Sequence, residues 1–289
     1  NMADDGSDYL RLQARDASTC FANGHDWFKF DGADRAVEQR AFGGQLIAHC
    51  IMAAARDTPE GWSCHSCHIH FLREGRMVYT NYVVAQVRTG RSYALIRVDG
   101  FEDAGRQVVS AMVSFCRPEC GPTVPACPIP TGLLPYPEAC RRFGAHERWP
   151  QAIPADHSGR RWYVAWEHVD GRGCPLNDRS APIAHAAALG FLSDFNFLWF
   201  AYQRARRLEY DLRMLASLDH VLHIHEAAFD ASQPMLYEVD APFAAGGRAL
   251  VRGRLWSVGM QTLIASTTQE GVLRLQARRS PTGNDLSKL

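Results

Sequence analysis

Lysine is almost absent from this chain of 289 residues: Lys29 and Lys288 are the only two, and every other cation is an arginine. The chain also lacks net charge, since 31 basic side chains balance 31 acidic ones. Without a positive field, binding to nucleic acid or to an anionic membrane surface is not expected. No continuous apolar run approaches the roughly 18 residues that cross a bilayer, so we expect no membrane span.

Signals for export and for common cofactors are also missing. The acidic start of the chain, Asn1 to Asp5, has no apolar run of the kind that forms a secretory signal. Nine cysteines, an odd number, then favour reduced and mostly buried thiols. There is no Walker loop, dinucleotide fingerprint or Gly-x-Ser-x-Gly elbow. We therefore expect the protein to work without a cofactor.

One cysteine motif invites a metal or haem interpretation. Cys64-His65-Ser66-Cys67-His68 has the spacing of c-type haem attachment, but that attachment needs export machinery and no export signal is present. Zinc binding through Cys64, Cys67, Cys116 and Cys120 would need a second cysteine pair at metal-ligand spacing, and none is clean. We expect no metal site.

Proline marks a boundary in the middle of the chain. Seven prolines fall within twenty residues, too many for a helix or a central strand. We interpret residues 117–140 as an extended linker, followed by irregular sequence to about residue 180. The prolines are Pro118, Pro122, Pro125, Pro128, Pro130, Pro135 and Pro137.

The segments on either side of the linker have the same predicted order, a helix followed by four strands. In the first segment these are a small-residue helix at 44–56 and strands at 64–72, 77–88, 93–102 and 108–116. In the second they are a longer helix at 183–208 and strands at 218–227, 235–241, 247–256 and 262–275. This order predicts an α+β fold in which an antiparallel sheet wraps around a helix, twice.

Short sequence echoes support an internal duplication. His68-Ile69-His70 returns 155 positions later, Gly90-Arg91-Ser92 returns as Gly247-Arg248-Ala249, and Val108-Val109-Ser110-Ala111 matches residues 263–266. We therefore divide the chain into a first repeat (1–117), a proline-rich linker and irregular segment (118–180), a second repeat (181–279) and a flexible tail (280–289).

Asp194 is the carboxylate best placed for chemistry. It lies inside a predicted helix, and its neighbours three and four residues away on the same face are Gly190, Phe191, Phe197 and Leu198. A carboxylate on so apolar a face needs a partner or a function, because an isolated buried charge is costly. The alternative is a structural aspartate that caps a loop amide.

Gln269 and Ser217 are the polar residues most suited to join it. Strand alternation turns Gln269 inward with Thr267 and leaves Glu270 towards solvent, and a buried amide needs partners. Ser217 precedes a strand and could add a hydroxyl, or could be an ordinary turn serine. Gly43-Gly44, at a helix start, could offer backbone amides to an anion or carbonyl oxygen, or could serve only close packing.

Several motifs together resemble the type II acyl-CoA thioesterases, which are double-hotdog enzymes. The resemblance covers about residues 10–276. The motifs are Ala41-Phe42-Gly43-Gly44-Gln45-Leu46, His68-Ile69-His70-Phe71-Leu72-Arg73, Gly90-Arg91-Ser92-Tyr93, Leu192-Ser193-Asp194-Phe195, Ala216-Ser217-Leu218-Asp219-His220 and Gln269-Glu270-Gly271-Val272-Leu273-Arg274.

The resemblance implies that Asp194, Ser217 and Gln269 hold the water that hydrolyses an acyl-CoA thioester. The substrate's phosphates need cations, for which Arg91 and Arg248 are candidates, although both could instead close salt bridges at strand turns. Homo-oligomers are plausible from the family. One departure is the segment 203–210, which is more basic and more helical than the short loop expected there.

The tail Ser287-Lys288-Leu289 matches the tripeptide that the peroxisomal import receptor binds. We expect a peroxisomal location, or a cytoplasmic one if the source is bacterial. Two other functions stay open. One is a hotdog acyl-CoA hydratase or dehydratase, although the stretch nearest to its motif, at 174–178, lacks the histidine. The other is an acyl-CoA binding module without catalysis.

Overall fold

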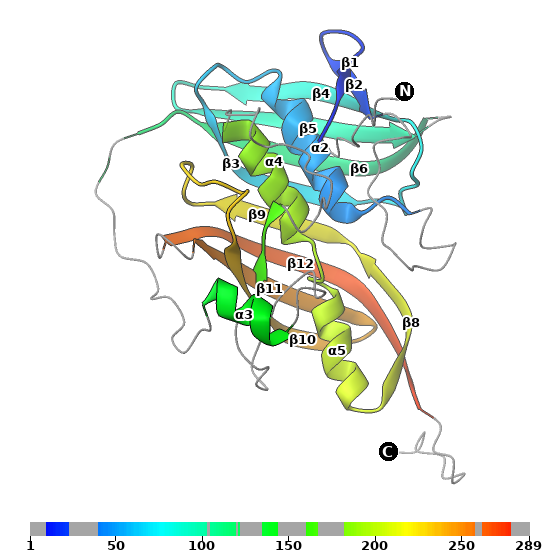
Figure 1. Ribbon diagram of the computed structural model, residues 1–289. Helices are drawn as coiled ribbons and strands as arrows, with labels where there is room; N and C mark the ends of the chain where they lie inside the picture. The colour runs from blue at the N-terminus through cyan, green and yellow to red at the C-terminus, as the bar shows by residue number, and fades with distance from the viewer. Residues whose placement is uncertain are drawn as a thin grey trace, which may run out of the picture.

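A computed structural model describes residues 10–22, 40–102, 105–119, 121, 135–143, 160–166, 182–257 and 262–278. These residues form one antiparallel sheet of twelve strands with helices packed on it (Figure 1). The strands are β1 (Gln13–Ala14), β2 (Thr19–Ala22), β3 (Ser63–Phe71), β4 (Thr80–Thr89), β5 (Tyr93–Glu102), β6 (Arg106–Cys116), β7 (Arg160–Val164), β8 (Tyr210–Ser217), β9 (Asp219–Ile224), β10 (Met235–Ala245), β11 (Arg248–Ser257) and β12 (Thr262–Ala277). The helices are α2 (Gly43–Ala55), α3 (Tyr136–Phe143), α4 (Pro182–Ser193) and α5 (Trp199–Arg207).

The sheet contains two groups of four strands with the same internal order. The first runs β4-β5-β6-β3, the second runs β10-β11-β12-β9, and the two meet where β3 pairs with β9. Helices α2 and α4 lie side by side on the same side of this sheet (Figure 1). The predicted α+β architecture, two central helices wrapped by antiparallel strands, is confirmed. The exact boundaries of the repeats stay a prediction.

Strand pairing corrects one of the three sequence echoes. On β6, Ala111 lies opposite Ile69 of β3, and on β12, Ala265 lies opposite Ile224 of β9. The equivalent residues of β6 and β12 are therefore 154 positions apart, one fewer than the echo of residues 108–111 with 263–266 indicates. Its mainly aliphatic residues match equally well one step out of register.

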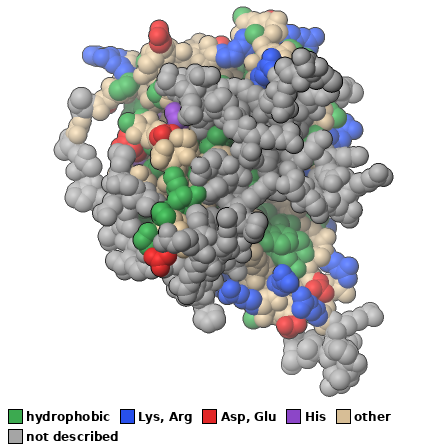
Figure 2. Space-filling model, viewed as in Figure 1, with side chains coloured by type: hydrophobic (Ala, Val, Ile, Leu, Met, Phe, Trp, Pro, Cys, Tyr) green, Lys and Arg blue, Asp and Glu red, His purple; other side chains and the backbone are tan. Residues whose placement is uncertain are grey.

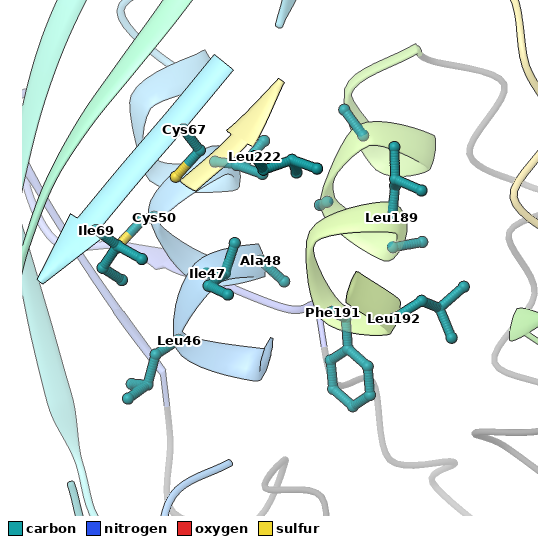
Figure 3. Close-up of a cluster of buried hydrophobic side chains, with 14 of the residues drawn as sticks. Leu46, Ile47, Ala48, Cys50, Cys67, Ile69, Leu189, Phe191, Leu192 and Leu222 are labelled. Carbon is teal, nitrogen blue, oxygen red and sulfur yellow. The ribbon is translucent and has the colours of Figure 1, made fainter. Parts of the chain in front are cut away.

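Close contact between α2 and α4 forms the centre of the core (Figure 3). Both helices are buried almost all round, and small residues let their backbones approach. A Cβ on Gly44 would lie 2.3 Å from the backbone oxygen of Phe191, and one on Gly190 would lie 2.9 Å from Ile47. Burying each large apolar side chain here contributes about 1.5–3 kcal/mol.

The long helix predicted at 183–208 is in fact two helices. α4 ends at Ser193 and α5 begins at Trp199, with Asn196 between them in the left-handed region at φ 55°. Within the segment 203–210, which we expected to be more helical than the family's loop, residues up to Arg207 are helical. The next strand, β8, was not predicted, and it pairs with the far end of β12.

Charged residues of both signs surround the end of α5 and the start of β8 (Figure 2). Three arginines lie in the last turn of α5, where the helix dipole favours positively charged side chains. Nearby, Arg278 forms ion pairs with Asp211 at 2.8 Å and with Glu209 at 3.4 Å. These exposed pairs each contribute little to stability.

The segment predicted as linker and irregular chain contains two regular elements. Helix α3 begins at Tyr136, inside the predicted linker, and β7 pairs with β10 at the end of the sheet. β7 is an edge strand, and its inward residues Trp162 and Val164 are buried. Of the seven prolines in the predicted linker, the structure describes Pro118, Pro135 and Pro137; the other four lie outside the described residues.

The cysteine-rich strand β3 divides its residues between two faces. Cys64 and Cys67 are buried with free thiols, whereas His68 is exposed on the opposite face. The haem-like spacing is therefore split across the sheet, and Cys120 lies outside the described residues. None of the helices in the described ranges is long and apolar enough to cross a membrane.

Candidate active site

Asp194 lies directly after the last residue of α4 and faces the beginning of α2. Its Oδ1 accepts a hydrogen bond of 2.7 Å from Nε2 of Gln269, and its carboxylate also accepts one from the backbone N–H of Gly44. A Cβ on Gly43 would lie 2.7 Å from Asp194 Oδ2. The predicted glycine pair therefore serves two purposes, since Gly43 leaves room for the carboxylate and Gly44 donates to it while packing against α4.

Gln269 and Ser217 come from neighbouring strands. Ser217 ends β8 opposite Gly271 of β12, and Gln269 points inward from β12, as the alternation predicted. Nε2 of Gln269 donates to Ser217 Oγ at 2.9 Å as well as to Asp194. Three residues that are 23 to 75 positions apart in the sequence thus form one connected polar cluster.

Burial dominates the electrostatics of the site. The apolar surroundings raise the pKa of Asp194 to about 7, against the lowering effect of the hydrogen bonds from Gln269 and Gly44. Phe42, which precedes Gly43, packs on Phe191 and Phe195 of the segment that carries Asp194, with ring centroids 4.7 to 5.6 Å apart. A carboxylate with this pKa accepts a proton readily near neutral pH.

The hydrogen positions follow from these contacts. Both N–H groups of Gln269 are directed at Asp194 and Ser217, so its amide has no N–H left to donate to an oxyanion. Ser217 Oγ accepts from Gln269, which leaves its own hydroxyl hydrogen to donate to a water or a substrate. The amide oxygen of Gln269 is buried and has no hydrogen-bond partner among the described residues.

The equivalent position in the first half of the chain carries no polar group. By the strand pairing, Gln269 corresponds to Phe115: Phe115 lies opposite Ala94 of β5, and Gln269 lies opposite the equivalent Val251 of β11. Phe115 is fully buried. The duplicated fold therefore builds this amide position only in its second half.

Arg91 does not lie beside this cluster. It precedes β5, whose first residue, Tyr93, pairs with Cys116 of β6, whereas the cluster lies by Phe71, whose partner on β6 is Val109. These partners are seven residues apart on β6, which is about 23 Å along a strand. Arg91 therefore lies near the opposite end of the strands from the cluster.

Arg248 is closer to the site but lies on the other face of the sheet. Its Nη1 is 3.0 Å from Oε1 of Glu270, and Glu270 points away from the face that carries Gln269. The strand-turn salt bridge that we considered for both arginines is thus present for Arg248. The third predicted group, Ser287-Lys288-Leu289, lies outside the described residues.

Two buried polar side chains behind Asp194 were missed by the sequence analysis. His220 Nε2 is 3.0 Å from Ser193 Oγ, and the Tyr237 hydroxyl is 2.5 Å from the backbone oxygen of Ser193. His220 follows Ser217 within the quoted Ala216–His220 motif, which was the available signal. Tyr237 lies in an ordinary apolar strand and gave none.

Known proteins share the sequence and the fold along most of the chain. Residues 33–116 match the family model of the acyl-CoA thioesterase N-terminal domain, and residues 123–273 match that of the acyl-CoA thioesterase C-terminal domain. Acyl-coenzyme A thioesterase 8 of Mus musculus is 29% identical over 274 residues, which cover 84% of this chain and 83% of that protein.

Solved structures of similar proteins have the same fold as this chain. The acyl-CoA thioesterase II TesB2 of Mycobacterium marinum has a TM-score of 0.67 at 24% identity, covering 94% of this chain and 98% of its own. A hot dog fold protein of unknown function from Alicyclobacillus acidocaldarius has a TM-score of 0.63 at 18% identity, covering 93% and 97%. With a double hotdog fold and family matches in both halves, this chain belongs to the type II acyl-CoA thioesterases.

Proposed function

We propose that this thioesterase hydrolyses acyl-CoA to a free fatty acid and coenzyme A with a water activated by Asp194. The observation that carries the proposal is the carboxylate itself, which burial removes from water, which is linked through Gln269 to Ser217, and whose pKa is raised to about 7. A general base is most effective when its pKa lies near the working pH.

The geometry favours a direct attack by water over a serine nucleophile. Among the described residues, the hydrogen bond that reaches Ser217 Oγ comes from Gln269, a neutral donor that cannot take a proton. Asp194 removes a proton from the water, and the water oxygen attacks the thioester carbonyl. Ser217 donates its hydroxyl hydrogen to the water or to the developing oxyanion.

The remaining steps need little further help from the protein. The tetrahedral oxyanion collapses and the carbon–sulfur bond breaks, releasing the thiolate of coenzyme A. Thiols ionise near pH 8.5, so this leaving group hardly needs an acid. Asp194 then returns its proton to solvent or to the thiolate, which restores the site.

Thiol release from medium- and long-chain acyl-CoA tests the proposal. Asp194→Asn keeps the shape and an acceptor for Gln269 but removes the base, so we expect kcat to fall about 100-fold or more. Asp240→Asn is a matched control, because that carboxylate pairs with Arg252 on the exposed face of the second half. Equal release by wild type and Asp194→Asn would contradict the proposal. No release from either would favour the binding module.

The proposal also covers substrate anchoring, location and assembly. The pantetheine arm separates the coenzyme A phosphates from the thioester, so Arg91 and Arg248 need not lie at the cluster to bind them. If they do bind them, Arg91→Ala and Arg248→Ala should raise KM for acyl-CoA without lowering kcat. If Ser287-Lys288-Leu289 is the natural terminus, a fluorescent fusion ending in it should enter peroxisomes, and one lacking Leu289 should not. The proposed homo-oligomer is checked by light scattering of the purified protein.

A further inference from the structure

Ser193, the last residue of α4, is held at its backbone by a buried tyrosine. Carbonyl groups at the end of a helix have no partner within the helix and need a donor. The Tyr237 hydroxyl donates to the Ser193 oxygen at 2.5 Å. That oxygen belongs to the peptide that joins Ser193 to Asp194, so the bond fixes the backbone from which the carboxylate extends.

The Ser193 side chain is held a second time. Its hydroxyl donates to the Gly190 oxygen at 2.8 Å, and a hydroxyl has only one hydrogen. His220 Nε2, 3.0 Å away, must therefore be the donor to Ser193 Oγ. This assigns the Nε2–H tautomer, and burial lowers the pKa of His220 to about 3, so the ring stays neutral at every working pH.

The two branches lead back to the chain segments that carry the other site residues. Thr267 Oγ1 lies 3.1 Å from the Tyr237 hydroxyl, whose hydrogen is already used, so Thr267 donates. Thr267 is two residues before Gln269 on the same inward face of β12. His220 is the second residue of β9, three residues after Ser217. Asp194 is thus tied to the segments of both of its proposed partners.

Tight packing leaves these groups little freedom. The Phe197 ring lies between the two, with centroids 5.6 Å from His220 and 5.5 Å from Tyr237. A Cβ on Gly253 would lie 2.5 Å from both Thr267 and the Tyr237 ring. The Nδ1 of His220 is buried without a hydrogen-bond partner among the described residues. Burying an unpaired ring nitrogen is unfavourable, and an apolar residue at this position would avoid that cost.

We propose that Tyr237 and His220 are positioning residues, which hold the Ser193–Asp194 peptide so that the carboxylate reaches Gln269 and the reacting water. The inference rests on the proposed function, because it assumes that Asp194 is the base. Neither residue touches the reacting atoms. Their effect passes through the backbone and side chain of Ser193.

Tyr237→Phe, compared with Tyr82→Phe, tests the first branch. Tyr82 is equally buried, and its hydroxyl bonds His49 of the first half of the chain at 2.8 Å rather than Ser193. We expect Tyr237→Phe to lower kcat about 10- to 100-fold with KM nearly unchanged. Because the Gln269 bond lowers the pKa of Asp194, its loosening should also move the acidic limb of the rate profile to higher pH. Tyr82→Phe should change neither.

His220→Leu and His220→Gln test the second branch. Leucine removes the donor to Ser193, whereas the glutamine amide nitrogen can replace Nε2, so we expect Gln to recover most of the kcat that Leu loses. The inference is overturned if Tyr237→Phe and Tyr82→Phe behave alike, or if both His220 variants lose the same activity. Retained thiol release by Asp194→Asn would instead show that the proposed function itself has failed.

Discussion

At the scale of the residue, Asp194 is governed by a competition between desolvation and hydrogen bonding. Two donors, Gln269 and Gly44, favour the charged carboxylate, and removal from water disfavours it. In the structure the effect of burial on the pKa of Asp194 prevails over that of the two donors. The result is a base that is half charged near neutral pH, which suits proton transfer.

The rate should therefore depend on pH through this one group. Protonated Asp194 cannot accept a proton, so we expect kcat to rise as pH increases, with a midpoint near the pKa of about 7, and to level off above pH 8. Stopped-time thiol release across pH 5 to 9 measures it. A profile that is flat down to pH 5 would exclude a raised pKa in the enzyme–substrate complex.

Stability should change in the opposite sense to activity. A carboxyl whose pKa is raised on folding stabilises the native state while both states are protonated, and this contribution is lost as pH rises through about 7. Asp194→Asn has no such charge, so we expect its unfolding free energy to exceed that of wild type at pH 8, by about 1–4 kcal/mol. Urea titrations at pH 5 and pH 8 check this, and the excess should shrink at pH 5.

At the scale of the element, the contact between α2 and α4 both stabilises the core and positions residues of the candidate active site. The two helices touch through glycine, and the first turn of α2 supplies the amide that reaches Asp194. The break between α4 and α5 turns the chain where the carboxylate must point into the cluster. Packing and chemistry thus share one helix pair.

Substitutions at adjacent glycines should separate these roles. Gly44→Ala forces a methyl against the Phe191 backbone, 2.3 Å away, so we expect a loss of about 1–3 kcal/mol in unfolding free energy. Gly43→Ala meets the Asp194 carboxylate instead and should mainly lower kcat. Thermal unfolding and thiol release of both variants measure the difference. Equal thermal midpoints would contradict the packing role of Gly44.

At the scale of the whole molecule, the two halves cannot be independent folding units. β3 pairs with β9, and α2 packs on α4, so each half buries its helix partly against the other. One continuous cluster of buried apolar residues spans both halves. The site draws residues from both halves, since Gly44 belongs to the first and Asp194 to the second.

Unfolding should accordingly be a single cooperative step. Ile47→Ala deletes a fully buried side chain of α2 that contacts α4, and we expect a loss of about 2–5 kcal/mol. Circular dichroism and tryptophan fluorescence should shift by the same amount in urea. Separate transitions for the two probes would show that the halves unfold independently.

Local sequence determined much of this protein. Period-two and helical patterns gave most strands to within a few residues, because burial on one face imposes alternation. The inward direction of Gln269 and the unusual apolar setting of Asp194 followed from the same patterns. The resemblance to type II thioesterases then identified Ser217, which composition and spacing treat as an ordinary turn residue.

Tertiary structure alone decided the rest. The break before α5, strand β8 and the edge strand β7 depend on pairing with distant segments, which local propensity does not specify. The distance in space between Arg91 and the site could not be predicted from their positions in the sequence, because it depends on strand register. The contacts of Tyr237 and His220 with Ser193 also depend on the fold. Nothing in the sequence distinguishes these two side chains; once they are buried away from water, their polar atoms need hydrogen-bond partners, and the fold places Ser193 within reach.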